Sequence, residues 1–152
     1  MLRRLIGRAI EWMLSYEHEV LWIGKGHPPF QKYADDAGWD LHSMNDVIVK
    51  PGTVVDIPTG VFIDPKSNIW FELRGRSSTI RNKKLQVQTG VIDHGWRGEL
   101  FICVYNPGNS IRKIKAGERI AQIIPHLVIP CRFKFGVLAP SERGSKGFGS
   151  TG

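Results

Sequence analysis

The stretch Gln88-Thr89-Gly90-Val91-Ile92-Asp93-His94-Gly95-Trp96-Arg97-Gly98-Glu99 carries most of the information about the fold. Two apolar residues lead into it, turn residues occupy its middle, and the apolar run 100–105 leads out, so the pattern predicts a β-hairpin. One carboxylate, Asp93, lies at the predicted bend, with the large aromatic Trp96 three residues later. The stretch alone fits either a shallow pocket with one acid or a surface turn with a solvated aspartate.

Glycine and proline divide the rest of the chain into short segments. The 152 residues suit a single domain with a substantial core, and the 17 glycines and 9 prolines are spread along the sequence. Apolar runs between the turns predict strands at 20–23, 39–41, 47–49, 54–57, 60–63, 69–73, 85–87, 100–105, 120–124 and 128–137. Strands do not alternate with helices, which argues against a Rossmann or P-loop domain and favours an all-β sandwich or closed barrel.

The net charge and the cysteines indicate which class of partner the protein binds and in which cellular compartment it works. A net charge of +7 predicts an anionic partner. No helix-turn-helix, zinc finger or aromatic-basic repeat is present, so we expect no nucleic-acid partner. Cys103 and Cys131 are far apart in apolar surroundings and form neither a disulfide framework nor a zinc pattern. Reduced thiols fit a cytoplasmic location, and a nuclear or virion-associated one is compatible with the same features.

The N-terminal residues 2–16 form the one segment with helical periodicity. An apolar stripe follows helical spacing, and consists of Leu2, Ile6, Ala9, Ile10 and Met13. Three arginines and Glu11 fall largely off this stripe, and the apolar run is too short to span a bilayer. We therefore expect a helical extension over residues 1–18. It either packs on the domain or its oligomer, or anchors the chain to a membrane or a protein partner.

The C-terminal segment 139–152 is glycine-rich and ends in a literal G-x-G-x-x-G at 147–152. No predicted strand leads into it and no helix follows, so it is not a dinucleotide-binding fingerprint. Its guanidinium, hydroxyl and backbone N–H groups suit phosphate oxygens, and Phe148 can stack over a base. The composition fits either a flexible arm that binds a phosphorylated ligand or a disordered terminus, and a lone Phe148 in such a tail favours the arm.

Five segments now stand in a fixed order. They are Asp36-Ala37-Gly38-Trp39-Asp40-Leu41-His42-Ser43, Gly75-Arg76-Ser77-Ser78, the stretch 90–99, Gly117-Glu118-Arg119-Ile120-Ala121-Gln122-Ile123-Ile124, and 143–152. Together they resemble the motifs of the trimeric dUTPase (dUTP pyrophosphatase) family. The resemblance implies an all-β, jelly-roll-like distorted β-barrel over residues 19–138, here with an extra N-terminal helix, that assembles as a homotrimer. It also implies that the arm 139–152 closes the active site of a neighbouring subunit.

The family resemblance further implies the reaction and the roles of the residues in the stretch 90–99. The substrate would be dUTP with Mg²⁺, hydrolysed to dUMP and pyrophosphate, which keeps uracil out of DNA and supplies dUMP for thymidylate synthesis. Asp93 resembles the general base that activates the water attacking the α-phosphate. The backbone of Gly90, Val91 and Ile92 resembles the segment that reads the uracil edge. Trp96 takes the place of the tyrosine that packs on the deoxyribose.

The remaining roles concern the triphosphate. Arg76, Ser77 and Ser78 resemble the residues that donate to the phosphates, and Gln122 matches a glutamine near the α-phosphate. Asp40 matches the acid that holds Mg²⁺ through water. The arm residues that match those closing over uracil and the γ-phosphate are Arg143, Phe148, Gly149, Ser150 and Thr151.

Two alternatives remain open. A dCTP deaminase shares this fold, and Trp96 and the Arg76–Arg81 spacing resemble its motifs. Deamination, however, needs a glutamate where Cys103 lies, and a thiol in an apolar strand is a poor substitute. The second alternative is a nucleotide-binding regulatory protein with the same fold. The basic N-terminal extension, which lies outside the family motifs, suggests this alternative.

Overall fold

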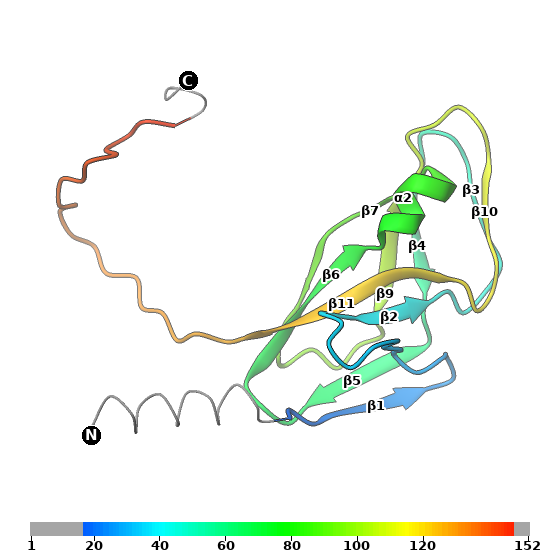
Figure 1. Ribbon diagram of the computed structural model, residues 1–152, viewed down its shortest axis with the longest axis horizontal. Coiled ribbons are helices and arrows are strands. Elements are labelled where there is room, and N and C mark those ends of the chain that lie inside the picture. Colours follow the sequence, from blue (N-terminus) through cyan, green and yellow to red (C-terminus); the bar gives the residue numbers. More distant parts are fainter. Residues whose placement is uncertain (1–16, 148–152) are drawn as a thin grey trace.

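The computed structural model describes residues 17–147 (Figure 1). The predicted helix over 2–16 and the arm residues Phe148, Gly149, Ser150 and Thr151 lie outside the described residues. The described chain is mostly β and contains one short helix. Its elements are β1 (Val20–Gly24), β2 (Trp39–His42), β3 (Val47–Val49), β4 (Val54–Pro58), β5 (Val61–Pro65), β6 (Ile69–Gly75), α2 (Ser77–Lys83), β7 (Gln86–Val87), β8 (Gly90–Ile92), β9 (Phe101–Tyr105), β10 (Arg112–Ile114) and β11 (Arg119–Leu127).

The strands form four antiparallel sheets, each of which is called a ladder below. The largest has the order β2-β11-β6-β8, a second has the order β4-β9-β7, and β1-β5 and β10-β3 form two-stranded ladders. The prediction of an all-β fold is therefore confirmed. The expected closed barrel is not found, because these ladders are not joined into one continuous sheet in the described chain.

One apolar core connects the four ladders. Buried and less buried residues alternate along β5 and along most of β6, as expected for strands with one face on a core. The buried side chains come from every ladder, and include Leu41, Val49, Ile57, Val61, Phe71, Ile102, Ile114 and Ile120. The ladders are thus fixed relative to one another by packing rather than by shared backbone hydrogen bonds.

The stretch 88–99 differs from the predicted hairpin. β8 pairs with β6, whereas β9 pairs with β4 and β7, so the strands on either side of the turn lie in different ladders. The turn itself is present, since the Trp96 N–H donates to the Asp93 carbonyl at 3.0 Å. Register with distant strands has replaced the local pairing that the sequence pattern indicates.

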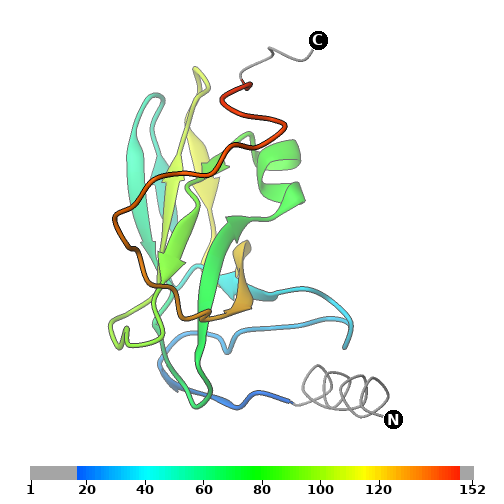
Figure 2. The ribbon, with the colours of Figure 1, turned by 90° about the vertical axis from the view of Figure 1, so that its left-hand side faces the viewer.

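Three further segments depart from the sequence prediction. Helix α2 was not predicted, because seven residues give no apolar stripe. Strand β10 was not predicted either, because Ile114 is its one core-facing side chain. The predicted strand over 128–137 is wrong: beyond β11 the chain leaves the body of the domain, and residues 128–138 are exposed without strand pairing (Figures 1 and 2).

Within residues 17–147, the structure contains no helix with the length and apolar character needed to cross a membrane.

Candidate active site

The turn formed by residues 93–98, here called the Asp93 turn, lies at the end of β8 near the beginning of β6. Gly90 and Ile92 pair with Leu73 and Phe71 of β6, and this register directs the turn toward the first residues of β6. His94 Nδ1 lies 3.2 Å from the Ile69 carbonyl oxygen, which fixes the turn against that strand. The Asp93 side chain is exposed, and no partner for its carboxylate is present in the described part of the chain.

Arg97 holds the Asp93 turn in shape. Its Nη1 donates to the carbonyls of His94 at 2.8 Å and Trp96 at 2.9 Å, and its Nη2 pairs with Asp64 at 2.6 Å. Asp64 also pairs with Lys66. The Lys66 hydrogen bond and, to a smaller extent, the Arg97 charge hold the pKa of Asp64 below its usual value. One guanidinium therefore joins the turn to β5.

Trp96 lies directly over Gly98. A Cβ at position 98 would be 2.2 Å from Trp96 Cζ2, so only glycine leaves room for the indole in this position. Trp96 is 51% exposed and presents its other face to solvent. The exit of the turn is anchored where Glu99 accepts a hydrogen bond from the Gly60 N–H at 2.8 Å. The aromatic ring and the acid are thus supported by one rigid segment.

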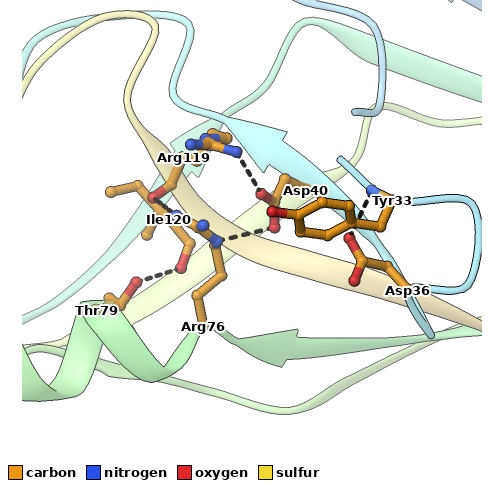
Figure 3. Close-up of polar contacts among 7 residues, drawn as sticks. All are labelled: Tyr33, Asp36, Asp40, Arg76, Thr79, Arg119 and Ile120. Atoms are coloured by element: carbon orange, nitrogen blue, oxygen red, sulfur yellow. Dashed lines mark hydrogen bonds and ion pairs between the residues drawn. The ribbon is translucent and has the colours of Figure 1, made fainter. Parts of the chain in front are cut away.

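A second group of side chains, here called the arginine cluster, consists of Asp40, Arg76 and Arg119 (Figure 3). Arg76 Nε lies 2.8 Å from Asp40 Oδ1, and Arg119 Nη1 lies 3.1 Å from Asp40 Oδ2. The Asp40 side chain is only 16% exposed. Two guanidinium groups face one carboxylate, so the cluster carries a net positive charge and attracts an anion.

Neighbouring contacts fix the arginine cluster in place. Arg76 Nη1 donates to the Arg119 carbonyl at 3.2 Å, and the Arg119 guanidinium lies 5.3 Å from the centre of the Phe30 ring. Thr79 Oγ1 donates to the Ile120 carbonyl at 2.6 Å and so ties α2 to β11 (Figure 3). Arg119 and Phe30 were not among the predicted site residues; Arg119 lies inside a quoted motif, whereas nothing in the sequence singles out Phe30.

The predicted phosphate-binding residues gather around this cluster. Ser77 and Ser78 are the first residues of α2, and Ser78 lines a cavity of about 350 Å³ together with Arg76 and Arg119. Gln122 pairs with Asp40 of β2 in the sheet register. Gly38 makes room for it, because a Cβ there would be 3.0 Å from Gln122 Oε1. Arg76, Ser78 and Arg119 thus line a polar, cationic recess that suits phosphate oxygens.

Arg143 lies apart from the arginine cluster. Its Nε donates to the Lys146 carbonyl at 3.1 Å, and the side chain is exposed. Among the described residues, no hydrogen bond or ion pair joins the arm to the residues expected to bind phosphate.

The residues of the arginine cluster suit a magnesium ion that enters bound to the phosphates of the ligand, and not one that the protein binds by itself. Both oxygens of Asp40 already face guanidinium groups, and residues 17–147 contain no cluster of three side chains suited to a metal. Oxygen ligands are what Mg²⁺ prefers, and phosphates supply them. Asp40 is therefore placed to orient the two arginines.

The Asp93 turn and the arginine cluster lie at opposite ends of β6. The pairing of Ile92 with Phe71 places Asp93 at the level of Trp70, whereas Arg76 directly follows the last residue of the strand. Six residues of extended chain correspond to about 20 Å. One chain therefore does not bring its predicted base to its predicted phosphate-binding residues.

Comparisons with known proteins show the family to which the chain belongs. The family model described as dUTPase matches residues 25–152. The chain belongs to the dUTPase family. A deoxyuridine 5'-triphosphate nucleotidohydrolase of Solibacter usitatus is 36% identical over 121 residues, which cover 78% of this chain and 82% of that protein.

Solved dUTPase structures share the fold. The Staphylococcus bacteriophage 80alpha dUTPase with dUPNHPP has a TM-score of 0.82 and 26% identity, and the match covers 91% of this chain and 99% of that one. A mutant dUTPase of the S. aureus phage phi11, described with a structural Mg(II) ion, has a TM-score of 0.71 and 19% identity and covers 84% of this chain and 99% of that one. The family membership favours the dUTPase interpretation over the deaminase.

Proposed function

We propose that this protein hydrolyses dUTP to dUMP and pyrophosphate by attack of water on the α-phosphate. The observation that carries the proposal is the carboxylate of Asp93, which has no partner within residues 17–147 and lies on a turn held by Arg97, in a chain of the dUTPase family. A carboxylate without an ion-pair partner is able to bind and deprotonate a water molecule. Removing uracil nucleotides in this way would protect DNA and supply dUMP for thymidylate synthesis in the cytoplasm.

The backbone of β8 supports recognition of the base. β8 is the last strand of its ladder and pairs only with β6, so its other edge is free within the described chain. Peptide N–H and C=O groups of Gly90, Val91 and Ile92 on that edge are available to the hydrogen-bonding edge of uracil. Trp96, seated on Gly98, would then pack against the deoxyribose.

The arginine cluster supports binding of the triphosphate. Arg76, Ser77, Ser78 and Gln122 would neutralise and orient its oxygens, while Asp40 holds the arginine at the required angle. Mg²⁺ would arrive bound to the triphosphate, and its charge would stabilise the pyrophosphate leaving group. The arm residues Arg143, Phe148, Gly149, Ser150 and Thr151 would close over the bound nucleotide and exclude bulk water.

The separation of the two groups supports a homotrimer with shared sites. A base about 20 Å from the phosphate-binding residues needs those residues from another chain. The segment after β11 supports the same assembly, since it exposes large apolar side chains that need cover: Ile129, Phe133, Phe135, Val137 and Leu138. Residues 19–138 would form the jelly-roll-like body, and 139–152 the arm that reaches a neighbouring site.

The decisive experiment measures both pyrophosphate and ammonia from dUTP, dCTP, dTTP and UTP with Mg²⁺. Pyrophosphate from dUTP alone is the expected result. Asp93→Asn should lower turnover by about 10²–10⁴-fold, the usual contribution of general-base catalysis, while dUTP binding persists. Asp35→Asn, an exposed acid near β2, is the matched control. Ammonia from dCTP, or near-parent turnover by the Asp93 variant, would refute the proposal.

A further inference from the structure

An apolar groove opens between the β1-β5 ladder and the β2-β11-β6 part of the largest ladder. It has a volume of about 710 Å³. Its walls are mainly apolar, and include Val20, Trp22, Trp39, Ile63, Phe71 and Ile123. Figure 1 shows β1 and β5 side by side below β2 and β11. The groove therefore lies between two sheets that share no backbone pairing.

The floor of this groove is formed by residues of the domain core. Ile63, Phe71 and Ile123 belong to the buried core and also line the groove. On its outer wall Trp22 is 41% exposed, and Ile63 is its partner in the ladder register. A groove of this size that reaches the core favours an apolar occupant over water.

The chain outside the described residues begins at the rim of the groove. Glu17, the first described residue, lines it, so residues 1–16 need no linker to reach it. Their sequence carries the apolar stripe Leu2, Ile6, Ala9, Ile10 and Met13. Direct attachment gives such a segment a high effective concentration at the groove.

Charge complementarity points to the same segment. The groove rim carries the acids Glu17 and Asp36. Residues 1–16 carry Arg3, Arg4 and Arg8 against the single acid Glu11. A basic amphipathic segment and an acidic rim around an apolar floor are complementary in both respects.

We propose that the apolar stripe of residues 2–13 docks in this groove of its own chain and closes the gap between the two ladders. The segment then stabilises the edge of the fold that carries β1. The inference does not depend on the proposed catalytic function, because the Asp93 turn and the arginine cluster do not line the groove.

Hydrogen exchange of the intact chain measures this docking. In Ile6→Ser/Ile10→Ser, amides of residues 20–24 and 29–37 should exchange at least about tenfold faster, since tenfold corresponds to about 1.4 kcal/mol and burial of one such side chain gives more. Amides of β4 and β9 should keep their rates. The control Ser15→Ala keeps the stripe and the three arginines, and should change the groove amides by less than about threefold, since surface substitutions rarely exceed 0.5 kcal/mol.

A cysteine pair distinguishes docking within one chain from docking between chains. With Cys103 and Cys131 replaced by serine, Ile10→Cys/Ala37→Cys should form a disulfide that leaves the chain at monomer mobility in denaturing gels. Dimer-sized products would overturn the proposal. So would unchanged groove exchange in the Ile6/Ile10 variant, or groove protection that is lost when residues 128–152 are removed, which would assign the groove to a neighbour's C-terminal segment.

Discussion

Asp40→Asn tests whether the arginine cluster is held together by one charge. The substitution keeps the shape of the side chain and removes the charge between Arg76 and Arg119, at 2.8 and 3.1 Å. A hydrogen bond to a charged group contributes about 1.5–3 kcal/mol and a neutral one about 0.5–1.5. Two weakened bonds, with the solvent screening of the partly exposed arginines taken into account, give a loss of about 2 kcal/mol.

That loss should be visible in two measurements. For a chain of this size, about 2 kcal/mol lowers the melting temperature by roughly 4–8 °C. Binding of dUPNHPP should weaken as well, because Arg76 loses the contact that orients it. Both quantities should be compared at the same protein concentration with Asp35→Asn, whose side chain is exposed.

The double variant Asp40→Asn/Arg119→Gln separates coupling from simple loss of charge. If Asp40 acts through Arg119, the loss of stability in the double variant should be smaller than the sum of the losses in Asp40→Asn and Arg119→Gln. A melting temperature and a nucleotide affinity of Asp40→Asn equal to those of Asp35→Asn would refute the reasoning, as would strictly additive effects in the double variant.

Three further predictions concern other parts of the structure. Gly98→Ala places a Cβ where Trp96 lies and should lower dUTP turnover at least tenfold, which corresponds to a barrier higher by about 1.4 kcal/mol. Gly95→Ala, where a Cβ meets open space, should leave turnover unchanged in the same assay. Asn106→Ala should lower the free energy of unfolding in urea by about 2–4 kcal/mol, because this fully buried amide donates to two carbonyls and accepts one N–H. Burial and the nearby His27 lower the pKa of His42 from its ordinary value of 6.5, so the unfolded chain takes up this proton before the folded chain does. The free energy of unfolding should therefore fall as the pH drops below 6.5. His42→Gln should make that fall smaller in urea titrations at several pH values.

The sequence predicts the strands of this fold better than their partners. Alternating apolar residues and turn signals are local, so the strands around residues 54–57, 69–73 and 120–124 lie where the pattern puts them. Pairing is not local. The turn chemistry at His94-Gly95 favours a hairpin, yet β8 pairs with β6 because Ile92 then joins the core beside Phe71.

In the segment 128–137 the sequence pattern predicts a strand that the structure does not contain. Its apolar alternation is typical of a strand, but a strand needs a partner, and one chain offers none to it in the described residues. The apolar pattern is a property of the sequence alone, whereas strand pairing needs a partner, which the proposed trimer would supply.

The candidate site was predictable in composition but not in geometry. The motifs contain Asp93, Arg76, Gln122 and Asp40, and family membership supports their roles as proposals. Sequence order, however, gives neither the contact of Arg119 with Phe30 nor the seat of Trp96 on Gly98. Both depend on segments that come together only through the register of the sheets.

The length of β6 has a consequence for mixtures of chains. Asp93 and Arg76 lie at its two ends, so in the proposed trimer each site would take its base from one chain and its arginine from another. Two inactive preparations, Asp93→Asn and Arg76→Ala, should regain activity when they are unfolded and refolded together, because some sites then combine an intact base with an intact arginine. In the proposed trimer with shared sites, dilution that separates the chains should likewise lower the activity before any chain unfolds.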